Sequence, residues 1–192
     1  MTAPRRIVLG ISGASGMPYA LRLLEILTGI EGFETHVIVS DGAKEVLRVE
    51  TKLTPEDLET RLARATRVYS EKEIGGSPAS GSWQHQGMVV CPCSMASLAA
   101  IAHGLGSNLL HRSADVTLKE KRPLILVVRE TPLNLTHLRN MTAAAESGAT
   151  IMPAMPGFYT RPTTIAQLVD HLVGRILDQL GVDHTLSTRW EG

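Results

Sequence analysis

The amino-acid sequence carries no excess charge of either sign. Its 192 residues include 19 Lys and Arg residues and 19 Asp and Glu residues, so the formal net charge is zero, and the two signs are well mixed along the chain. Proteins that bind nucleic acid normally carry a basic stripe, which this sequence lacks. We therefore expect no nucleic-acid partner.

Cysteine and long hydrophobic runs are also scarce. The two cysteines, Cys91 and Cys93, lie one residue apart, which is neither a disulfide framework nor a metal-binding spacing. We expect two reduced thiols and no structural zinc. The first apolar run follows "MTAPRR" and has about five residues, too few for a signal-peptide core or a membrane span. The pattern predicts a cytoplasmic protein that has no membrane partner.

What the sequence does contain is a regular alternation of apolar, β-type segments with segments of helical period. The β-type segments are 6–11, 34–40, 87–92, 123–128 and 149–153, and the helical segments are 18–28, 42–51, 94–102, 135–147 and 164–180. Continuously apolar strands are buried on both faces, and their alternation with helices indicates a parallel sheet with right-handed crossovers. Because the length suits one domain, we predict a single α/β domain, residues 1–192, with a doubly wound parallel sheet.

Residues at the ends of several segments support these helices. Thr54 and Pro55 are typical of the start of a further helix, whereas Gly148 and Gly181 are typical of helix ends. Residues 69–87 are rich in Gly and Ser and have no clear period. They predict a surface or active-site loop.

A glycine-rich turn follows the first predicted strand. Gly10, Gly13 and Gly16 form the pattern G-x-x-G-x-x-G, and a helix begins directly afterwards. Such a turn presents backbone N–H groups and the positive end of a helix to an anion, which favours a phosphate. The spacing differs from the dinucleotide motif G-x-G-x-x-G and from the P-loop, so a mononucleotide is favoured over NAD or ATP. The alternative is a tight turn in which Ser12 and Ser15 cap the helix.

A second polar loop, "CPCSMAS" at 91–97, also ends an apolar strand and begins a helix. In an open α/β sheet, ligands bind outside the carboxyl ends of the strands, so the two loops could hold one ligand, and Ser40 marks a third such end. Cys91 and Cys93 are expected to be small residues at the edge of the core, because the sequence places no His to activate them.

Charged residues flank the predicted strand at 123–128. Arg112 and Lys119 precede it, and Arg129 and Glu130 follow it. They could form a solvated rim, but the last two lie where ligands bind, and an Arg fork suits phosphate while Glu can move protons.

The segment "PAMPGFYTRP", residues 153–162, contains three prolines and an aromatic pair, in a sequence with only two Phe, three Tyr and two Trp. Phe158 and Tyr159 could stack on a planar ligand or pack against a neighbouring helix or subunit.

Together these segments resemble the UbiX/Pad1 family of flavin prenyltransferases. The likeness runs from about Ile7 to Trp190 and rests on "GISGASG", "CPCSMASLAAIAHG", "RSADVTLKEKRPLILVVRETP", "HLRNM", "PAMPGFY" and "RILDQLG". The resemblance implies a Rossmann-like flavoprotein fold, usually assembled as a homododecamer, that attaches a dimethylallyl group to N5 and C6 of reduced FMN. It also implies dimethylallyl monophosphate as the donor, no metal ion, and prenylated FMN as a product that serves UbiD-type decarboxylases.

The resemblance also implies roles for individual residues. The residues expected to contact FMN are Gly13, Ala14, Ser15, Ser40, Ser94, Met95, Ala96, Ser97 and Arg129. The residues expected to hold the donor phosphate are Lys119, Glu130, Tyr159 and Arg175, with Trp190 near the same pocket. The catalytic candidates are Ser15, Glu50, Lys119 and Glu130. In a dodecamer, some of these residues are expected to reach the site from neighbouring subunits.

The implied chemistry agrees with these residue types. Cationic side chains and the Tyr159 hydroxyl could stabilise the leaving phosphate in place of magnesium. Trp83, Trp190 or the flavin itself could stabilise positive charge on the allyl group. Glu50, Glu130 or the departing phosphate could accept the proton lost from C6.

Three other functions stay open from the sequence. Flavin-dependent cysteine decarboxylases share the glycine-rich loop but typically carry an active-site His and a P-x-M-N motif, where this chain has "SPASGSW" and "PAMPGFY". A flavin-binding accessory subunit would not need the residues expected to hold the donor phosphate. Direct decarboxylation of an aromatic acid would use the same cationic pocket. The resemblance gives none of the seven His residues a catalytic role: His36, His85, His103, His111, His137, His171 and His184.

Overall fold

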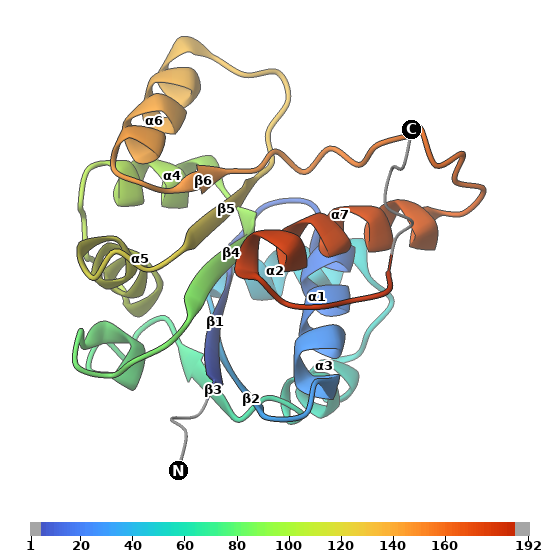
Figure 1. Ribbon diagram of the computed structural model, residues 1–192, viewed down its shortest axis with the longest axis horizontal. Coiled ribbons are helices and arrows are strands. Elements are labelled where there is room, and N and C mark those ends of the chain that lie inside the picture. The colour runs from blue at the N-terminus through green and yellow to red at the C-terminus, as the bar shows by residue number, and fades with distance from the viewer. Residues whose placement is uncertain (1–4, 187–192) are drawn as a thin grey trace.

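The computed structural model describes residues 5–186, which form a six-stranded sheet with helices on both faces (Figure 1). The strands are β1 (Arg5–Ile11), β2 (Phe33–Val39), β3 (Arg67–Ser70), β4 (Gly87–Cys93), β5 (Leu124–Val128) and β6 (Thr150–Ile151). Their order is β3-β2-β1-β4-β5-β6, and every pair is parallel. This doubly wound order confirms the predicted fold class and places the reversal of strand order between β1 and β4, where such folds bind ligands.

The helices are divided between two apolar cores. One core lies under α1 (Met17–Gly29), α2 (Asp41–Glu50), α3 (Pro55–Leu62) and α7 (Ile165–Leu180), and the other under α4 (Met95–Ala102), α5 (Leu109–Lys119) and α6 (Leu135–Glu146). A short 3-10 helix, η1 (Ser77–Ala79), precedes β4. Figure 1 shows the two sets of helices on opposite sides of the strands. None of the helices within residues 5–186 is long and apolar enough to cross a membrane.

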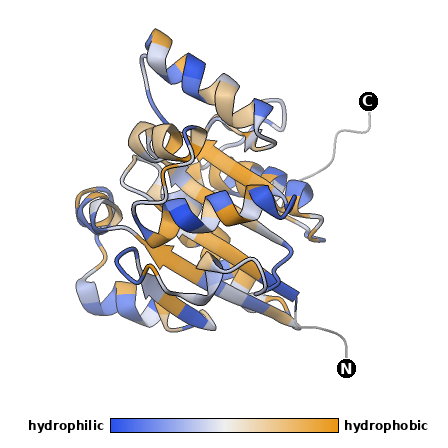
Figure 2. Ribbon diagram, turned by 90° about the vertical axis from the view of Figure 1, so that its left-hand side faces the viewer, coloured by the Kyte–Doolittle hydropathy of each residue, from blue (hydrophilic) through white to orange (hydrophobic). Residues whose placement is uncertain are grey.

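The strands are apolar on both faces because both faces are covered. All residues of β4 and β5 are buried. Along β1, Ile7 and Leu9 enter the core under α1 and α7, whereas Val8 enters the core under α4 and α5. Figure 2 shows the strands coloured mostly as hydrophobic, whereas the helices carry both hydrophobic and hydrophilic residues. Each fully buried Leu, Ile or Val side chain contributes about 1.5–3 kcal/mol, so the sheet is the stable frame that carries the loops.

Two elements differ from the sequence prediction. The prediction began a loop at Tyr69, but residues 67–70 form β3, a short edge strand paired with β2. Only Tyr69 of this strand is fully buried, so no apolar run marks it. The sequence pattern also predicts no helix at 109–119, where α5 buries Leu109, Ala114 and Val116 among polar residues.

The predicted helix boundaries are confirmed where capping residues marked them. Thr54 accepts a hydrogen bond from the backbone N–H of Asp57 and starts α3 in a capping box. Gly148 follows the end of α6 with φ 103°, and Gly181 ends α7 with φ 65°. Both glycines adopt the left-handed conformation that glycine accepts without a steric penalty.

Candidate functional site

Ser12 joins the two loops that lie at the reversal of strand order. Its hydroxyl donates to the Pro92 carbonyl at 2.9 Å and accepts from the Ser94 backbone N–H at 2.8 Å. The side chain is buried, with an exposed fraction of 1%. The glycine-rich turn after β1 and the polar loop after β4 are therefore held against each other by one serine that the sequence analysis treated only as a helix cap.

The N-terminus of α1 is capped by a carboxylate from another helix. Gly16 precedes α1 with φ 115°, and no side chain of the turn caps the helix, so the alternative of capping serines is wrong. The backbone N–H groups of Gly16 and Met17 both donate to Glu50 Oε2, at 2.9 Å each. The turn binds an anion, as its sequence predicts, but that anion is the carboxylate of Glu50 at the end of α2.

Glu50 is held in its ionised form by its surroundings. Partial burial raises the pKa of its carboxyl group, but hydrogen bonds from Ser15, Met17 and Gly16 and the positive charge of Arg129 together bring that pKa below the ordinary value. Three residues predicted for the site are thus brought together: Ser15 from the turn after β1, Glu50 from the end of α2 and Arg129 from directly after β5.

The turn after β1 also packs closely against the start of α2. Ser40 caps α2 by accepting a hydrogen bond from the Ala43 backbone N–H at 3.0 Å. A Cβ atom at Gly13 would lie 2.9 Å from the backbone carbonyl carbon of Gly42. Glycine is therefore required at position 13, since a side chain there would separate the turn from α2. Ala14, the next residue, is buried.

The second loop begins α4 with two serines in contact. The Ser94 hydroxyl accepts from the Ser97 backbone N–H and donates to the Ser97 hydroxyl, both at 3.2 Å. Of the residues between them, Met95 is half-buried and Ala96 is exposed. His111 Nε2 lies 3.3 Å from the Ser97 hydroxyl, and burial lowers the pKa of His111. The family resemblance gives His111 no catalytic role, and its contact with Ser97 depends on α5, a helix that the sequence pattern does not predict.

Cys91 and Cys93 are inert at this edge of the sheet. Both side chains are fully buried in the core. Burial raises the pKa of both thiols, that of Cys93 to about 12. Their burial confirms the expectation that they are small core residues, and the raised pKa values favour the neutral thiols over the nucleophilic thiolates.

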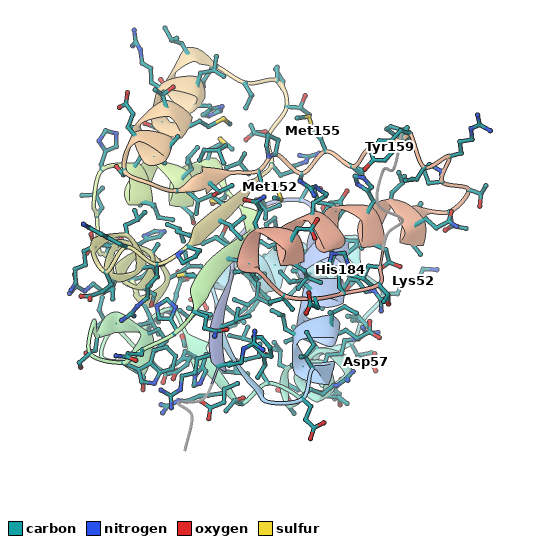
Figure 3. All side chains as sticks on the ribbon, viewed as in Figure 1. Lys52, Asp57, Met152, Met155, Tyr159 and His184 are labelled. Atoms are coloured by element: carbon teal, nitrogen blue, oxygen red, sulfur yellow. The ribbon has the colours of Figure 1, made fainter. Side chains whose placement is uncertain are left out.

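Further predicted residues follow β5 and β6. Arg129 and Glu130 are exposed at the carboxyl end of β5, where the Arg129 backbone N–H donates to the Cys93 carbonyl at 3.2 Å. Tyr159 lies on the segment between β6 and α7 (Figure 3), and its hydroxyl is 2.9 Å from His171 Nε2. Arg175 lies on the exposed face of α7 and forms an ion pair with Asp178.

Lys119 lies at the other edge of the sheet. It ends α5, and its ammonium group lies next to Gly81 in the loop before β4. Arg122 donates to the Gly81 carbonyl at 2.8 Å, and this loop leads to the amino end of β4, beside the amino end of β1. Because a strand rises about 3.3 Å per residue, β1 separates the two edges by about 20 Å. One chain therefore does not bring Lys119 to Glu50.

The two tryptophans do not complete the site within one chain either. Trp83 packs edge-on against His36 with ring centroids 4.7 Å apart, and the Arg6 guanidinium lies 5.1 Å from its ring centroid. Arg6 begins β1, so Trp83 lies at the amino edge and not beside Glu50. Trp190 lies outside the described residues.

The donors at the carboxyl edge fit a flavin mononucleotide. Ser15 follows β1, Ser40 follows β2, and Ser97 lies in the first turn of α4 after β4. Their hydroxyl groups are hydrogen-bond partners of the kind that a polyol and a phosphate need. Arg129 adds a guanidinium fork that suits a phosphate. Because Gly13 has no Cβ, the turn packs directly against the start of α2.

A separate hollow of about 470 Å³ lies between α2, α3 and β3. Its walls are largely apolar, with Leu47, Leu58 and Val68 among the lining residues. None of the predicted site residues lines it. The chemistry of the chain therefore points to the carboxyl edge between β1 and β4 and not to this hollow.

Comparison with known proteins gives the family. Residues 1–177 match the family model described as Flavoprotein. The flavin prenyltransferase UbiX of Thauera aromatica is 47% identical over 187 residues, which cover 97% of this chain and 94% of that protein. The chain belongs to the UbiX/Pad1 family of flavin prenyltransferases.

Solved structures of the UbiX/Pad1 family share the fold closely. AnUbiX (PadA1), solved in complex with FMN and dimethylallyl pyrophosphate, is 40% identical with a TM-score of 0.93, and the match covers 99% of each chain. A dodecameric FMN-dependent UbiX-like decarboxylase from Escherichia coli O157:H7 is 40% identical with a TM-score of 0.92, covering 97% of this chain and 100% of that one. By contrast, the cysteine decarboxylase TvaF is 17% identical with a TM-score of 0.59 over 78% of this chain and 90% of that one, a likeness of fold alone.

Proposed function

We propose that the chain is a flavin prenyltransferase that joins a dimethylallyl group to N5 and C6 of reduced FMN. The observation that carries this proposal is the meeting of Ser15, Glu50 and Arg129 at the reversal of strand order, in a chain of the UbiX/Pad1 family. These groups combine a hydroxyl, a carboxylate and a cation at the place where doubly wound folds bind ligands.

FMN is proposed to lie across the carboxyl ends of β1, β2, β4 and β5. The residues proposed to hold it are Gly13, Ala14, Ser15, Ser40, Ser94, Met95, Ala96, Ser97 and Arg129. This proposal is supported by the hydrogen bonds of Ser12 and Ser94, which hold the two loops together without a ligand. Reduced FMN supplies the nucleophilic N5 and C6 positions when it is bound.

The donor is proposed to be dimethylallyl monophosphate, and cationic side chains are proposed to stabilise its leaving phosphate without a metal ion. Arg129 lies at the carboxyl edge for this purpose. Lys119, Arg175 and Tyr159 are proposed to complete the phosphate site together with Glu130. Fixed cations stabilise charge that builds on a leaving oxygen, which lowers the barrier to breaking the allylic C–O bond.

Glu50 is proposed to act through its charge. Because the pKa of Glu50 is below its ordinary value, this carboxylate is a weak proton acceptor. Its negative charge can instead stabilise the positive charge that develops on the allyl group as the phosphate leaves. The second bond, to C6, converts the C=C of the transferred prenyl group into a single bond, so that group gains one proton while C6 loses one. Glu130 and the departing phosphate are the remaining candidates to carry these protons.

Lys119 is proposed to reach the site from a neighbouring subunit of a homododecamer. Two facts support this proposal: Lys119 lies at the amino edge of its own sheet, and a dodecamer is the state named for the related Escherichia coli O157:H7 structure. We further propose that the chain works in the cytoplasm and passes prenylated FMN to a UbiD-type decarboxylase.

The proposal is tested by anaerobic incubation of the chain alone with reduced FMN and dimethylallyl monophosphate, with a chelator present. Mass spectrometry of the released flavin is expected to show the gain of one five-carbon prenyl unit. A parallel reaction with dimethylallyl pyrophosphate determines the phosphorylation state that the donor needs. If FMN binds tightly but leaves unmodified with both donors, the chain is a binding protein and the proposal fails.

The same preparation distinguishes a prenyltransferase from the two alternative decarboxylases. A prenyltransferase is expected to leave a peptidyl-cysteine substrate and an aromatic acid unchanged when no partner enzyme is present. Carbon dioxide released from either substrate by the chain alone would instead support a decarboxylase.

A further inference from the structure

His171 lies on the buried face of α7 and uses both of its ring nitrogens. Its exposed fraction is 8%, and its neighbours Val169, Leu172 and Val173 belong to the apolar core under α1 and α7. Nδ1 accepts a hydrogen bond from the Gly157 backbone N–H at 3.2 Å, and Nε2 lies 2.9 Å from the Tyr159 hydroxyl. A polar ring in an apolar helix face needs such partners.

The contact with Gly157 fixes the direction of the contact with Tyr159. A backbone N–H can only donate, so Nδ1 of His171 must carry a lone pair and no proton. The proton of the neutral imidazole is then on Nε2, and Nε2–H donates to the Tyr159 hydroxyl oxygen. The hydroxyl hydrogen of Tyr159 is therefore directed away from His171.

The segment between β6 and α7 is built around this pair of rings. The two rings meet edge to face, with centroids 5.3 Å apart and an interplanar angle of 79°. A Cβ atom at Gly157 would lie 2.8 Å from Tyr159 Cε1 and 3.1 Å from His171 Cε1. Glycine at 157 thus lets the backbone close over the rings. Tyr159 is more than half exposed, with an exposed fraction of 53%, yet its hydroxyl end is anchored to the core.

We propose that His171 is a positioning residue that holds the Tyr159 phenol and directs its hydroxyl hydrogen to the phosphate of the prenyl donor. This proposal rests on the proposed function, which places Tyr159 in the donor-phosphate site. An exposed tyrosine on a loop samples several rotamers, and fixing it before the donor binds removes that entropy from the cost of binding. His171 itself touches neither the donor nor the flavin.

The test compares His171→Phe, His171→Gln and Tyr159→Phe in the full chain. Phenylalanine fills the core but removes both hydrogen bonds, whereas the glutamine amide N–H can still donate to the Tyr159 hydroxyl. We expect His171→Phe to raise the KM for dimethylallyl monophosphate about 10-fold, the value of one hydrogen bond, with a smaller change in kcat. His171→Gln is expected to recover part of this loss, and FMN affinity is expected to stay unchanged in all three variants.

A double variant shows whether the two residues act through one interaction. If His171 works through the Tyr159 hydroxyl, the variant with both Phe substitutions is expected to lose no more than Tyr159→Phe alone. His137→Phe serves as the control for a histidine that also makes a backbone contact: His137 accepts from the Asn134 backbone N–H at the start of α6, on the face of the sheet opposite α7, and its loss is expected to leave the KM for the donor unchanged. Additive losses, or a loss that glutamine does not recover, would show that His171 acts only on folding and would overturn the proposal.

A binding measurement keeps this test separate from that of the proposed function. Calorimetry with dimethylallyl monophosphate and the FMN-loaded chain reports donor affinity whether or not prenyl transfer occurs. Active wild type with unchanged donor affinity in His171→Phe refutes only the role of His171. Wild type that neither binds the donor nor modifies the flavin refutes both proposals.

Discussion

At the scale of single residues, Glu50 links the helix dipole of α1 to the chemistry of the site. Its carboxylate accepts hydrogen bonds from the two backbone N–H groups at the start of α1, and the positive charge of Arg129 lowers its pKa. The helix end, which the glycine pattern alone predicts to bind a phosphate, is therefore already neutralised. We therefore propose that the phosphate groups of a ligand bind to the serines and to Arg129 and not to this helix end.

The first prediction concerns Glu50→Gln. The amide oxygen can still accept from Gly16 and Met17, but the negative charge at the helix end is lost. We expect the free energy of unfolding at neutral pH to fall by about 0.3–1 kcal/mol, the usual value of such a charge, and the rate of prenyl transfer to fall about tenfold or more. Urea unfolding and the flavin assay measure the two effects.

The pH dependence of that difference follows from the lowered pKa. Because the folded-state pKa of Glu50 is below the reference value of 4.5, its stabilising contribution is complete above that pH. The contribution is lost as the pH falls through the lower folded-state pKa. Wild type and Glu50→Gln are therefore expected to converge in stability in acid. An equal difference in unfolding free energy at neutral and acidic pH would show that the charge of Glu50 is not the cause.

The second prediction concerns Ser12→Ala. Removing the hydroxyl leaves the Ser94 backbone N–H without its acceptor and removes one hydrogen bond to the Pro92 carbonyl, both in a buried place. We expect a loss of about 1–3 kcal/mol in unfolding free energy and weaker FMN binding, measured by chemical denaturation and by quenching of flavin fluorescence. Ser147→Ala, at the exposed end of α6, is the matched control and is expected to change stability by less than about 0.5 kcal/mol.

At the scale of elements, the turn after β1 depends on its close approach to α2. The third prediction is that Gly13→Ala weakens FMN binding and lowers the melting temperature, because its Cβ would meet the Gly42 backbone at 2.9 Å. Gly29→Ala, at the end of α1, meets no atom within 4 Å and is expected to be neutral or slightly stabilising. Equal melting temperatures and FMN affinities in the two variants would contradict the packing argument.

The same scale shows what the sequence can and cannot predict. Local patterns predicted β1, β2, β4 and β5 because each is a buried apolar run, and they predicted the loops at the carboxyl ends of these strands. The sequence pattern did not predict the edge strand β3 or helix α5, in which apolar and polar residues are mixed, because both are stabilised by the elements that they pack against. Contacts between distant segments, such as Ser12 with Ser94 and Gly16 with Glu50, depend on the topology and leave no local pattern. For His171, the sequence offers one sign of a specific contact: it is a polar residue within the apolar face of α7.

At the scale of the whole molecule, the proposed phosphate site is divided between the two edges of the sheet: Lys119 lies at the amino edge, whereas Arg129 and Glu130 follow β5 at the carboxyl edge. Large apolar side chains are exposed beyond the carboxyl edge, including Met155 and Phe158, each with an exposed fraction of at least 70%. Their segment joins β6 to α7 and carries Tyr159 (Figure 3). An exposed apolar group of this kind agrees with a contact between subunits that would bring Lys119 to Glu50 of another chain.

The fourth prediction tests that arrangement by mixing subunits. Glu50→Gln and Lys119→Ala are each expected to abolish most of the activity in a pure assembly. Mixed assemblies of the two variants, refolded or expressed together, are expected to regain activity, because some sites receive an intact Glu50 from one chain and an intact Lys119 from its neighbour. A mixture no more active than its two components would place both residues in a site within one chain.

The central claim is that this chain bonds a dimethylallyl group to both N5 and C6 of reduced FMN. The most direct measurement is proton NMR of the flavin released, under anaerobic conditions, after reaction with dimethylallyl monophosphate. We predict loss of the aromatic C6 proton signal and new signals from a ring that joins C6 to N5. A flavin that keeps its C6 proton, whether unmodified or substituted at N5 alone, would contradict the claim.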